Sequence, residues 1–155
     1  AFAKIHLEHP AVRIVFLGDG PNFNALSALA GELGIADKVD FVSHERNIGD
    51  YYEAIDLLVL PSRSEGLPNV VLEAMSFSVP VVASEVGAVS EIINNGLNGW
   101  LIPPNDVDAL SNQLHQVLSN KPQLRIIGEV ACLSLQPKFC PIARTQKILD
   151  LYEQI

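Results

Sequence analysis

Two carboxylates in one stretch of the sequence are spaced so that they could bind a polar ligand together. The stretch reads PSRSEGLPNVVLEAM (residues 61–75), and Glu73 follows Glu65 after seven intervening residues. A carboxylate accepts two hydrogen bonds from a vicinal diol, which is what a ribose presents. Taken singly, Glu65 fits a solvated loop charge and Glu73 a partner of a helix dipole. The pair in this context favours binding of a ligand.

The residues between the glutamates predict a turn followed by the start of a helix. Gly66 permits backbone conformations closed to other residues and close approach by a ligand. Pro68 suits the first turn of a helix, and Asn69 also lies near that start. The free N–H groups and the positive end of the helix dipole would form a site for a diphosphate. Glu73 would lie about 6 to 8 Å further along the helix axis, at roughly 1.5 Å per residue.

A second turn with glycines, GDGPN (residues 18–22), follows the apolar run VRIVFLG. A dinucleotide-binding fingerprint requires a third glycine after two spacers. Phe23 occupies that place after Gly18 and Gly20, so the fingerprint is absent. The turn is either purely structural or a loop whose backbone approaches phosphates or a sugar.

Apolar runs alternate with helical periodicity along the chain, which predicts strands and helices in turn. Strands are expected at residues 12–18, 39–43, 56–61, 79–84 and 99–104. Helices are expected in the first ten residues and at 22–33, 48–55, 69–77, 88–95, 106–118, 123–135 and 141–154. This order implies an α/β fold, a doubly wound, Rossmann-like parallel sheet with helices on both faces. The run at 56–61 predicts a strand buried on both faces. Ligands of such sheets bind outside the carboxyl ends of the strands, where both loops described above would lie.

The composition limits the class of protein and its partners. The 155 residues, 48% of them hydrophobic and 18% charged, indicate one folded domain with Trp100 and Phe77 in its core. A net charge of −8 weighs against a nucleic-acid surface, and no apolar run reaches the roughly 18 residues of a membrane helix. The mean hydropathy of +0.25 is high for a free-standing domain, and a face normally covered by a missing partner would explain it.

Metal binding is not expected from the histidines and cysteines. His6, His9 and His115 fall on predicted helices without partners, and Cys132 and Cys140 fit no metal spacing. The two cysteines are therefore expected to be ordinary reduced thiols.

The stretch PSRSEGLPNVVLEAMSFSVPVVASEVGAVSEIINNGLNGWLIPPND (residues 61–106) resembles the donor-binding half of retaining glycosyltransferases with the GT-B fold. Their E-x7-E motif is matched by Glu65 and Glu73. The resemblance also covers GDGPNFNALSALAGELGIADKVDFVSH (residues 18–44) and, more weakly, the final KILDLYEQI. It therefore spans nearly the whole chain.

The resemblance implies that Glu65 contacts hydroxyls of the donor sugar, as the catalytic residue of this chain, and that Glu73 binds the nucleotide ribose. The donor is expected to be a nucleoside-diphosphate sugar, and no metal or other cofactor is expected. The remaining donor-binding residues would be Gly18, Gly20, Gly66, Leu67, Pro68, Asn69 and Val70. The nucleobase is expected to pack against the loop that contains Val42, Ser43, His44 and Arg46.

The resemblance also implies that parts of the protein are missing. The family's phosphate-clamping arginine and lysine follow a strand that would precede this chain, and Arg13, Arg46 and Arg63 do not match them. Residues 1–155 are thus expected to form one nucleotide-sugar-binding domain, truncated before its first strand and separated from an N-terminal acceptor domain. Ser78 stands where a glycine is usual, which should affect only a helix end.

Together these features predict the donor-binding half of a retaining sugar transferase with an unknown acceptor, inactive as an isolated fragment. The complete protein is expected in the cytoplasm, with membrane association only through the absent part. A nucleotide-sugar epimerase of similar fold and a non-catalytic nucleotide-binding relic are the alternatives. A response-regulator receiver is disfavoured, because its central strand would end in a phospho-accepting aspartate where this chain has Leu60 and Pro61.

Overall fold

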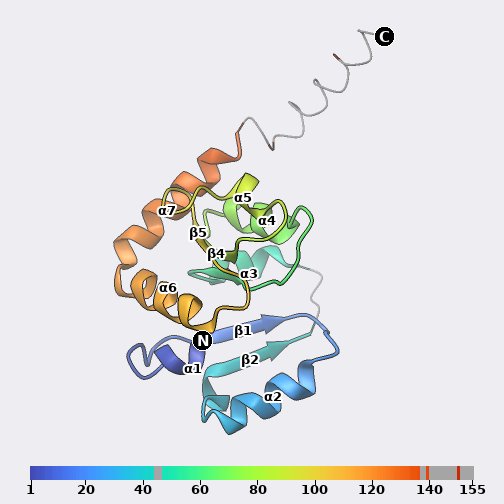
Figure 1. The fold of residues 1–155 in the computed structure, drawn as a ribbon, viewed down its shortest axis with the longest axis vertical. Helices are drawn as coiled ribbons and strands as arrows, with labels where there is room; N and C mark the ends of the chain where they lie inside the picture. The colour runs from blue at the N-terminus through green and yellow to red at the C-terminus, as the bar shows by residue number, and fades with distance from the viewer. Residues whose placement is uncertain (44–46, 137–138, 140–149, 151–155) are drawn as a thin grey trace.

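The computed structural model describes residues 1–43, 47–136, 139 and 150, in which strands and helices alternate (Figure 1). The strands are β1 (Ile14–Leu17), β2 (Val39–Val42), β3 (Leu58–Leu60), β4 (Val81–Ser84) and β5 (Trp100–Ile102). The helices are α1 (Phe2–Ile5), α2 (Phe23–Glu32), the 3-10 helix η1 (Ala36–Lys38), α3 (Gly49–Ala54), α4 (Asn69–Ser76), α5 (Val89–Ile92), α6 (Val107–Ser119) and α7 (Lys121–Ser134).

These elements confirm the predicted order of strands and helices within the described residues. Helix ends follow local signals, since Asp106 caps α6 by accepting a hydrogen bond from the Ala109 N–H at 2.8 Å. Gly34, just beyond α2, has a φ of +67°, the left-handed conformation in which glycine commonly ends a helix. The predicted helix at 141–154 lies outside the described residues except for residue 150.

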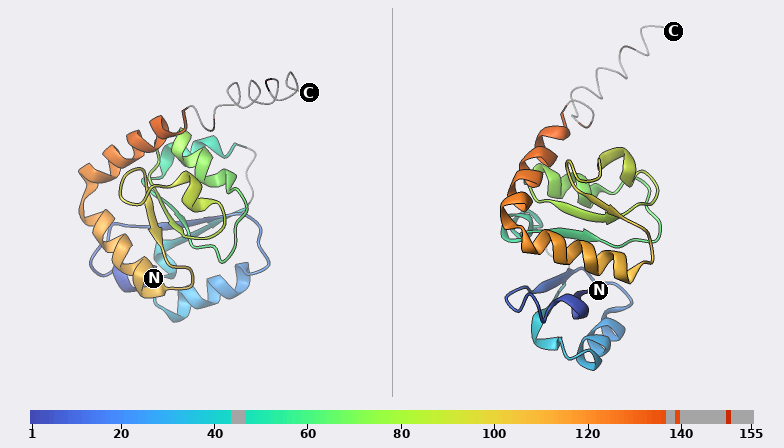
Figure 2. Two further views of the ribbon diagram at one scale, coloured as in Figure 1. Left: turned by 45° about the horizontal axis from the view of Figure 1, so that its top comes forward. Right: turned by 60° about the vertical axis from the view of Figure 1, so that its left-hand side comes forward.

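All strand pairs are parallel, as predicted, but the strands form two sheets. β1 pairs with β2, with Ile14 opposite Val39, and a second sheet has the order β3-β4-β5. The β1–β2 pair forms a layer of its own with α2, and β1 is the strand of that pair turned toward the rest of the molecule (Figures 1 and 2). The side chains of β3 are only half-buried, so the prediction of a strand buried on both faces is wrong. β3 is an edge strand of its sheet.

The main core surrounds the three-stranded sheet. All four residues of β4 are buried, and their side chains alternate between two apolar clusters on opposite faces of the sheet. Val81 and Ala83 pack with α4 and α5, whereas Val82 packs with Trp100 and residues of α6 and α7. Trp100 is buried as predicted. Phe77 is 43% exposed, so its predicted place in the core is wrong.

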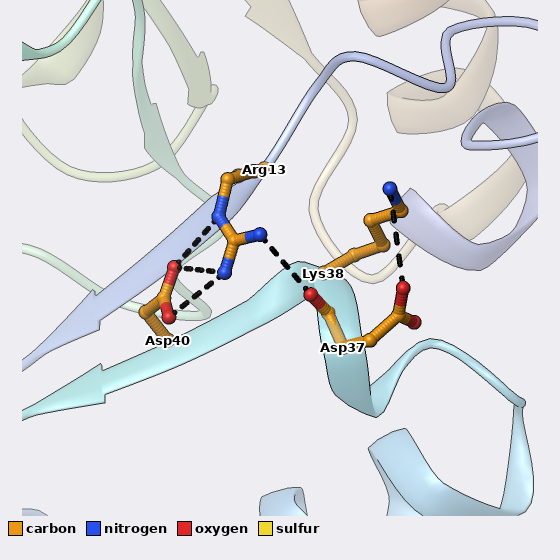
Figure 3. A network of polar contacts seen from close by, with 4 residues as sticks. All are labelled: Arg13, Asp37, Lys38 and Asp40. Carbon is orange, nitrogen blue, oxygen red and sulfur yellow. Dashed lines mark hydrogen bonds and ion pairs between the residues drawn. The ribbon is translucent and has the colours of Figure 1, made fainter.

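The β1–β2 layer is held by aromatic contacts and by an exposed ion pair between Arg13 and Asp40. Phe16 and Phe41, opposite each other in the register, stack at 5.3 Å between ring centroids. Arg13 donates two hydrogen bonds to Asp40 Oδ2 and one to Oδ1, and a further one to the Asp37 carbonyl (Figure 3). The Arg13 guanidinium is therefore engaged within the layer.

Helix α1 joins the β1–β2 layer to the main core by packing on α6. Lys4 pairs with Asp108, and His9 Nε2 lies 3.2 Å from His115 Nδ1. The expectation that these histidines lack partners is therefore wrong. No helix among the described residues is long and apolar enough to cross a membrane.

Candidate functional site

The loop from β3 to α4 carries Glu65 in a defined position. Glu65 is half-buried, and its Oε1 accepts a hydrogen bond from Ser62 Oγ at 2.6 Å. A carboxylate oxygen has more than one acceptor site, so Oε2 and part of Oε1 remain available to a ligand. This short contact within the loop fixes where the carboxylate points.

A second contact holds the backbone of the same loop against the turn before α5. Gly87 has a φ of +53°, and a β-carbon there would lie 1.8 Å from the Glu65 carbonyl oxygen. The Ala88 N–H donates to the Gly66 carbonyl at 3.2 Å. Only a glycine allows this approach, so Gly87 determines where the Glu65–Gly66 segment lies. Gly87 was not among the predicted site residues; its signal was a glycine three residues beyond the end of the buried strand β4.

Gly66 itself does not adopt a left-handed conformation, because the glycines with positive φ are Gly18, Gly34, Gly87 and Gly96. The predicted conformational reason for a glycine here is therefore wrong. The predicted openness is present, since a β-carbon at Gly66 would have no heavy atom within 4 Å. Leu67 is 48% exposed beside it, whereas Pro68 is buried.

Helix α4 begins where Pro68 and Asn69 predicted. Pro68 is the N-cap, Asn69 is the first helical residue, and no side chain caps this end. The positive end of the helix dipole is therefore not neutralised by a capping side chain. Val71, Ala74 and Met75 anchor the helix in the core, which leaves Val70 and Glu73 on the exposed side. Glu65 thus lies in the loop before an uncapped helix start, and Glu73 lies just over one turn inside the same helix.

Glu73 has a partner that the sequence analysis did not predict. Tyr52 Oη donates a hydrogen bond to Glu73 Oε2 at 2.8 Å. Burial raises the pKa of the Tyr52 hydroxyl, and the hydrogen bond to Glu73 and the charge of Glu73 raise this pKa further. Tyr52 therefore remains a hydrogen-bond donor at neutral pH. The only signal for it was an aromatic residue in the helix preceding β3.

The remaining candidate residues that the structure describes lie in or next to the two-stranded sheet. Gly18 has a φ of +125° and donates its N–H to the Val42 carbonyl at 2.9 Å, which ends the β1–β2 pairing. Gly20 accepts from the Phe23 N–H at 3.2 Å in the turn before α2. Ser43 is exposed directly after β2, whereas His44 and Arg46 lie outside the described residues. Gly18, Gly20 and Ser43 thus adjoin the β1–β2 sheet, whereas the loop with Glu65 follows β3 of the other sheet.

Sequence comparison places this chain among sugar transferases. Residues 1–131 match the family described as glycosyl transferases group 1. All of the chain aligns at 35% identity with 39% of N-acetyl-alpha-D-glucosaminyl L-malate synthase from Bacillus anthracis. At 33% identity, 84% of the chain aligns with 38% of the lipopolysaccharide core biosynthesis mannosyltransferase LpsB from Rhizobium meliloti. The chain therefore spans about two fifths of the length of these relatives.

Comparison with solved structures agrees with the sequence comparison. HepE from Anabaena, solved in complex with UDP and with UDP-glucose, superposes with a TM-score of 0.85 at 25% identity, over 94% of this chain and 42% of HepE. The same parallel α/β architecture is therefore present in both proteins. With the family match over most of its residues, the chain belongs to the glycosyl transferases group 1 family.

Proposed function

We propose that the complete polypeptide transfers a sugar from a nucleoside-diphosphate sugar to an acceptor, with retention, and that this chain is the donor-binding part. The observation that carries the proposal is the uncapped start of α4, with Glu65 in the loop before it and Glu73 just over one turn inside the helix. HepE, which binds UDP and UDP-glucose and has the same fold, supports a nucleotide-sugar donor. The names of two relatives, N-acetyl-alpha-D-glucosaminyl L-malate synthase and the mannosyltransferase LpsB, support sugar transfer as the reaction.

The site supplies a chemical role for each part of the donor. Glu65 accepts hydrogen bonds from sugar hydroxyls, and Glu73 accepts them from the ribose diol. The diphosphate lies along the backbone of Gly66, Leu67, Asn69 and Val70, with Pro68 offering only its carbonyl. The turn of Gly18 and Gly20 also contacts the donor, and the nucleobase packs on the loop at 42–46.

Catalysis then rests on stabilising the leaving group. When the bond between the sugar and the diphosphate breaks, negative charge builds on the diphosphate. Preorganised N–H groups and a helix N-terminus stabilise such charge most strongly where water is excluded. The reaction needs no bound metal in this proposal, because cationic side chains from the rest of the polypeptide complete the charge balance.

We locate those cations on a further strand that lies between β1 and β3. Such a strand would join the two parallel sheets into one. Support comes from β1, where Val15, Phe16 and Leu17 are 37 to 41% exposed, values unusual for a parallel strand. Helix α2 and its C-cap expose a stripe of large apolar side chains, which supports only the more general idea that a further part of the polypeptide covers this layer: Phe23, Leu26, Leu29 and Leu33.

The additional strand is proposed to come from the part of the polypeptide that precedes this chain, together with a domain that binds the acceptor. Cysteine labelling of the complete polypeptide tests this. A cysteine introduced as Leu17→Cys should be protected from a thiol reagent, whereas one introduced as Ile126→Cys, at a 59% exposed position on α7, should react. Equal reaction at both positions would contradict the proposed strand.

The donor assignment is tested by calorimetry with UDP and GDP. Glu73→Ala should weaken binding of the preferred nucleotide by about tenfold, the loss of hydrogen bonds to a charged acceptor. Unchanged affinity would remove the ribose assignment. A transfer assay on the complete polypeptide with nucleoside-diphosphate sugars separates the enzyme from its alternatives, because an epimerase would return an isomerised nucleotide sugar and a relic would return the donor unchanged.

The unpaired thiol of Cys132 supports a cytoplasmic location, which belongs to the same proposal. Fractionation of cells that produce the complete polypeptide tests it. The complete polypeptide should be recovered in the cytoplasmic or the membrane-associated fraction. Its termini should not be accessible from outside the cell.

A further inference from the structure

The Tyr52–Glu73 hydrogen bond joins two helices that are separated by β3 and by the Glu65 loop. Tyr52 lies on α3, whereas Glu73 lies on α4. The Oη to Oε2 distance of 2.8 Å is that of a direct hydrogen bond. The tyrosine side is buried and the glutamate side is exposed, so the contact lies at the boundary between core and solvent.

The tyrosine ring is held on the buried side of this contact. Tyr52 is only 5% exposed and belongs to the main apolar cluster. Its ring stacks on Phe77 with 5.5 Å between centroids and an interplanar angle of 27°. The backbone N–H of Tyr52 is bonded to the Ile48 carbonyl in the first turn of α3. The hydroxyl is therefore a rigid donor, presented from a packed ring.

Glu73 is the partner whose side chain must be held in place. An exposed glutamate has several freely rotating side-chain bonds, and immobilising it when a ligand binds costs side-chain entropy. The tyrosine occupies one acceptor position on Oε2 and leaves Oε1 and the rest of Oε2 available. A carboxylate held in this way is ordered before a ligand arrives.

We infer that Tyr52 is a positioning residue that orients the Glu73 carboxylate for the ribose diol of the donor. The inference rests on the proposed function, since it takes Glu73 as the ribose ligand. Tyr52 acts through Glu73 and does not touch the donor. Its removal should therefore weaken recognition of the diol and leave the chemical step unchanged.

Tyr52→Phe tests this in the complete polypeptide, because it keeps the stacked ring and removes only the hydroxyl. The probes are UDP and GDP, each compared with its 2′-deoxy counterpart by calorimetry. For the nucleotide that binds, Tyr52→Phe should reduce the preference for the ribose form by about threefold to tenfold, the range for one hydrogen bond. The KM for the nucleotide-sugar donor should rise by a similar factor, while kcat remains that of the parent protein.

Three further variants separate the possible failures. Glu73→Ala should abolish most of the preference for ribose, and Tyr52→Phe added to Glu73→Ala should change nothing more. If Glu73→Ala alters the preference but Tyr52→Phe does not, the positioning role is wrong and the proposed function stands. If Glu73→Ala has no effect, or neither nucleotide binds, the donor assignment fails and this inference fails with it. A fall in kcat on Tyr52→Phe at unchanged KM would also overturn it. Tyr51→Phe, on the same helix, should leave the preference unchanged.

Discussion

Gly87 and Glu65 approach each other so closely that no side chain fits between them. A β-carbon at position 87 would lie 1.8 Å from the Glu65 carbonyl oxygen and 2.9 Å from its carbonyl carbon. Both atoms belong to the backbone, so no side-chain rotation could relieve the overlap. The position of Glu65, which is proposed to bind the donor sugar, is therefore set by a glycine more than twenty residues away along the chain.

Gly87→Ala should displace the loop that carries Glu65. The positive φ alone costs a non-glycine residue about 1 to 2 kcal/mol, and the steric overlap adds to this. Sugar transfer by the complete polypeptide should fall more steeply than its thermal stability, measured by a transfer assay and by calorimetric Tm. The control is Gly31→Ala within α2, where a β-carbon would meet nothing within 4 Å. That variant should gain about 0.5 to 1 kcal/mol. Full activity of Gly87→Ala would contradict the role given to this contact.

Ser78→Gly should stabilise the protein without changing activity. Ser78 follows α4 with a φ of +59°, a conformation that glycine adopts readily. The free energy of unfolding should rise by about 0.5 to 1 kcal/mol in urea titrations. The gain from relieving the strain is partly offset, because glycine gives the unfolded chain more conformational freedom. Asn105→Gly is the matched control, since Asn105 also has a φ of +59° but asparagine tolerates this region. A gain no larger at Ser78 than at Asn105 would speak against strain.

Tyr52 should make stability fall at alkaline pH. Its pKa in the folded protein is raised above the ordinary value of 10.0, chiefly by burial. Above pH 10 an unfolded tyrosine releases its proton while folded Tyr52 retains it, so the free energy of unfolding decreases as the pH rises. The contribution is fully present below pH 10. Tyr52→Phe should flatten the decline of the free energy of unfolding, measured by urea titration, above pH 10. Tyr51→Phe should retain the decline. An equal slope of the free energy of unfolding against pH in the two variants would contradict the role given to Tyr52.

Removing the Arg13–Asp40 pair should have a small effect despite its favourable geometry. The two side chains are 53% and 46% exposed, where solvent and salt screen the attraction. Asp40→Asn should lower the free energy of unfolding by less than about 1 kcal/mol, and the loss should shrink in 1 M salt. A loss that is large and independent of salt would mean that the pair is needed to hold β1 against β2.

Local patterns in the sequence were sufficient to predict most helices and strands, because their signals lie within each element. Pro68 and Asn69 predicted the start of α4, and Asp106 predicted the start of α6. The Tyr52–Glu73 contact joins residues on different helices, and no periodicity indicates which side chains meet after folding.

The same limit explains the incorrect predictions about burial. An apolar run predicts a strand but does not say which strand lies beside it, so the exposure of β3 and the division into two sheets could not be predicted. Phe77 was predicted in the core from its residue type, yet it lies at the end of α4, where one face of its ring covers Tyr52. Gly66 was assigned the conformational freedom that the fold requires at Gly87.

The division of the strands into two sheets has a consequence for cooperativity. The β1–β2 layer joins the remainder largely through α1 on α6, so its amide hydrogens should exchange with solvent well before those of β4. In the complete polypeptide, a strand between β1 and β3 would merge the two into one unit that opens as a whole. Exchange measured by mass spectrometry should then give the peptides of β1 and β4 the same protection.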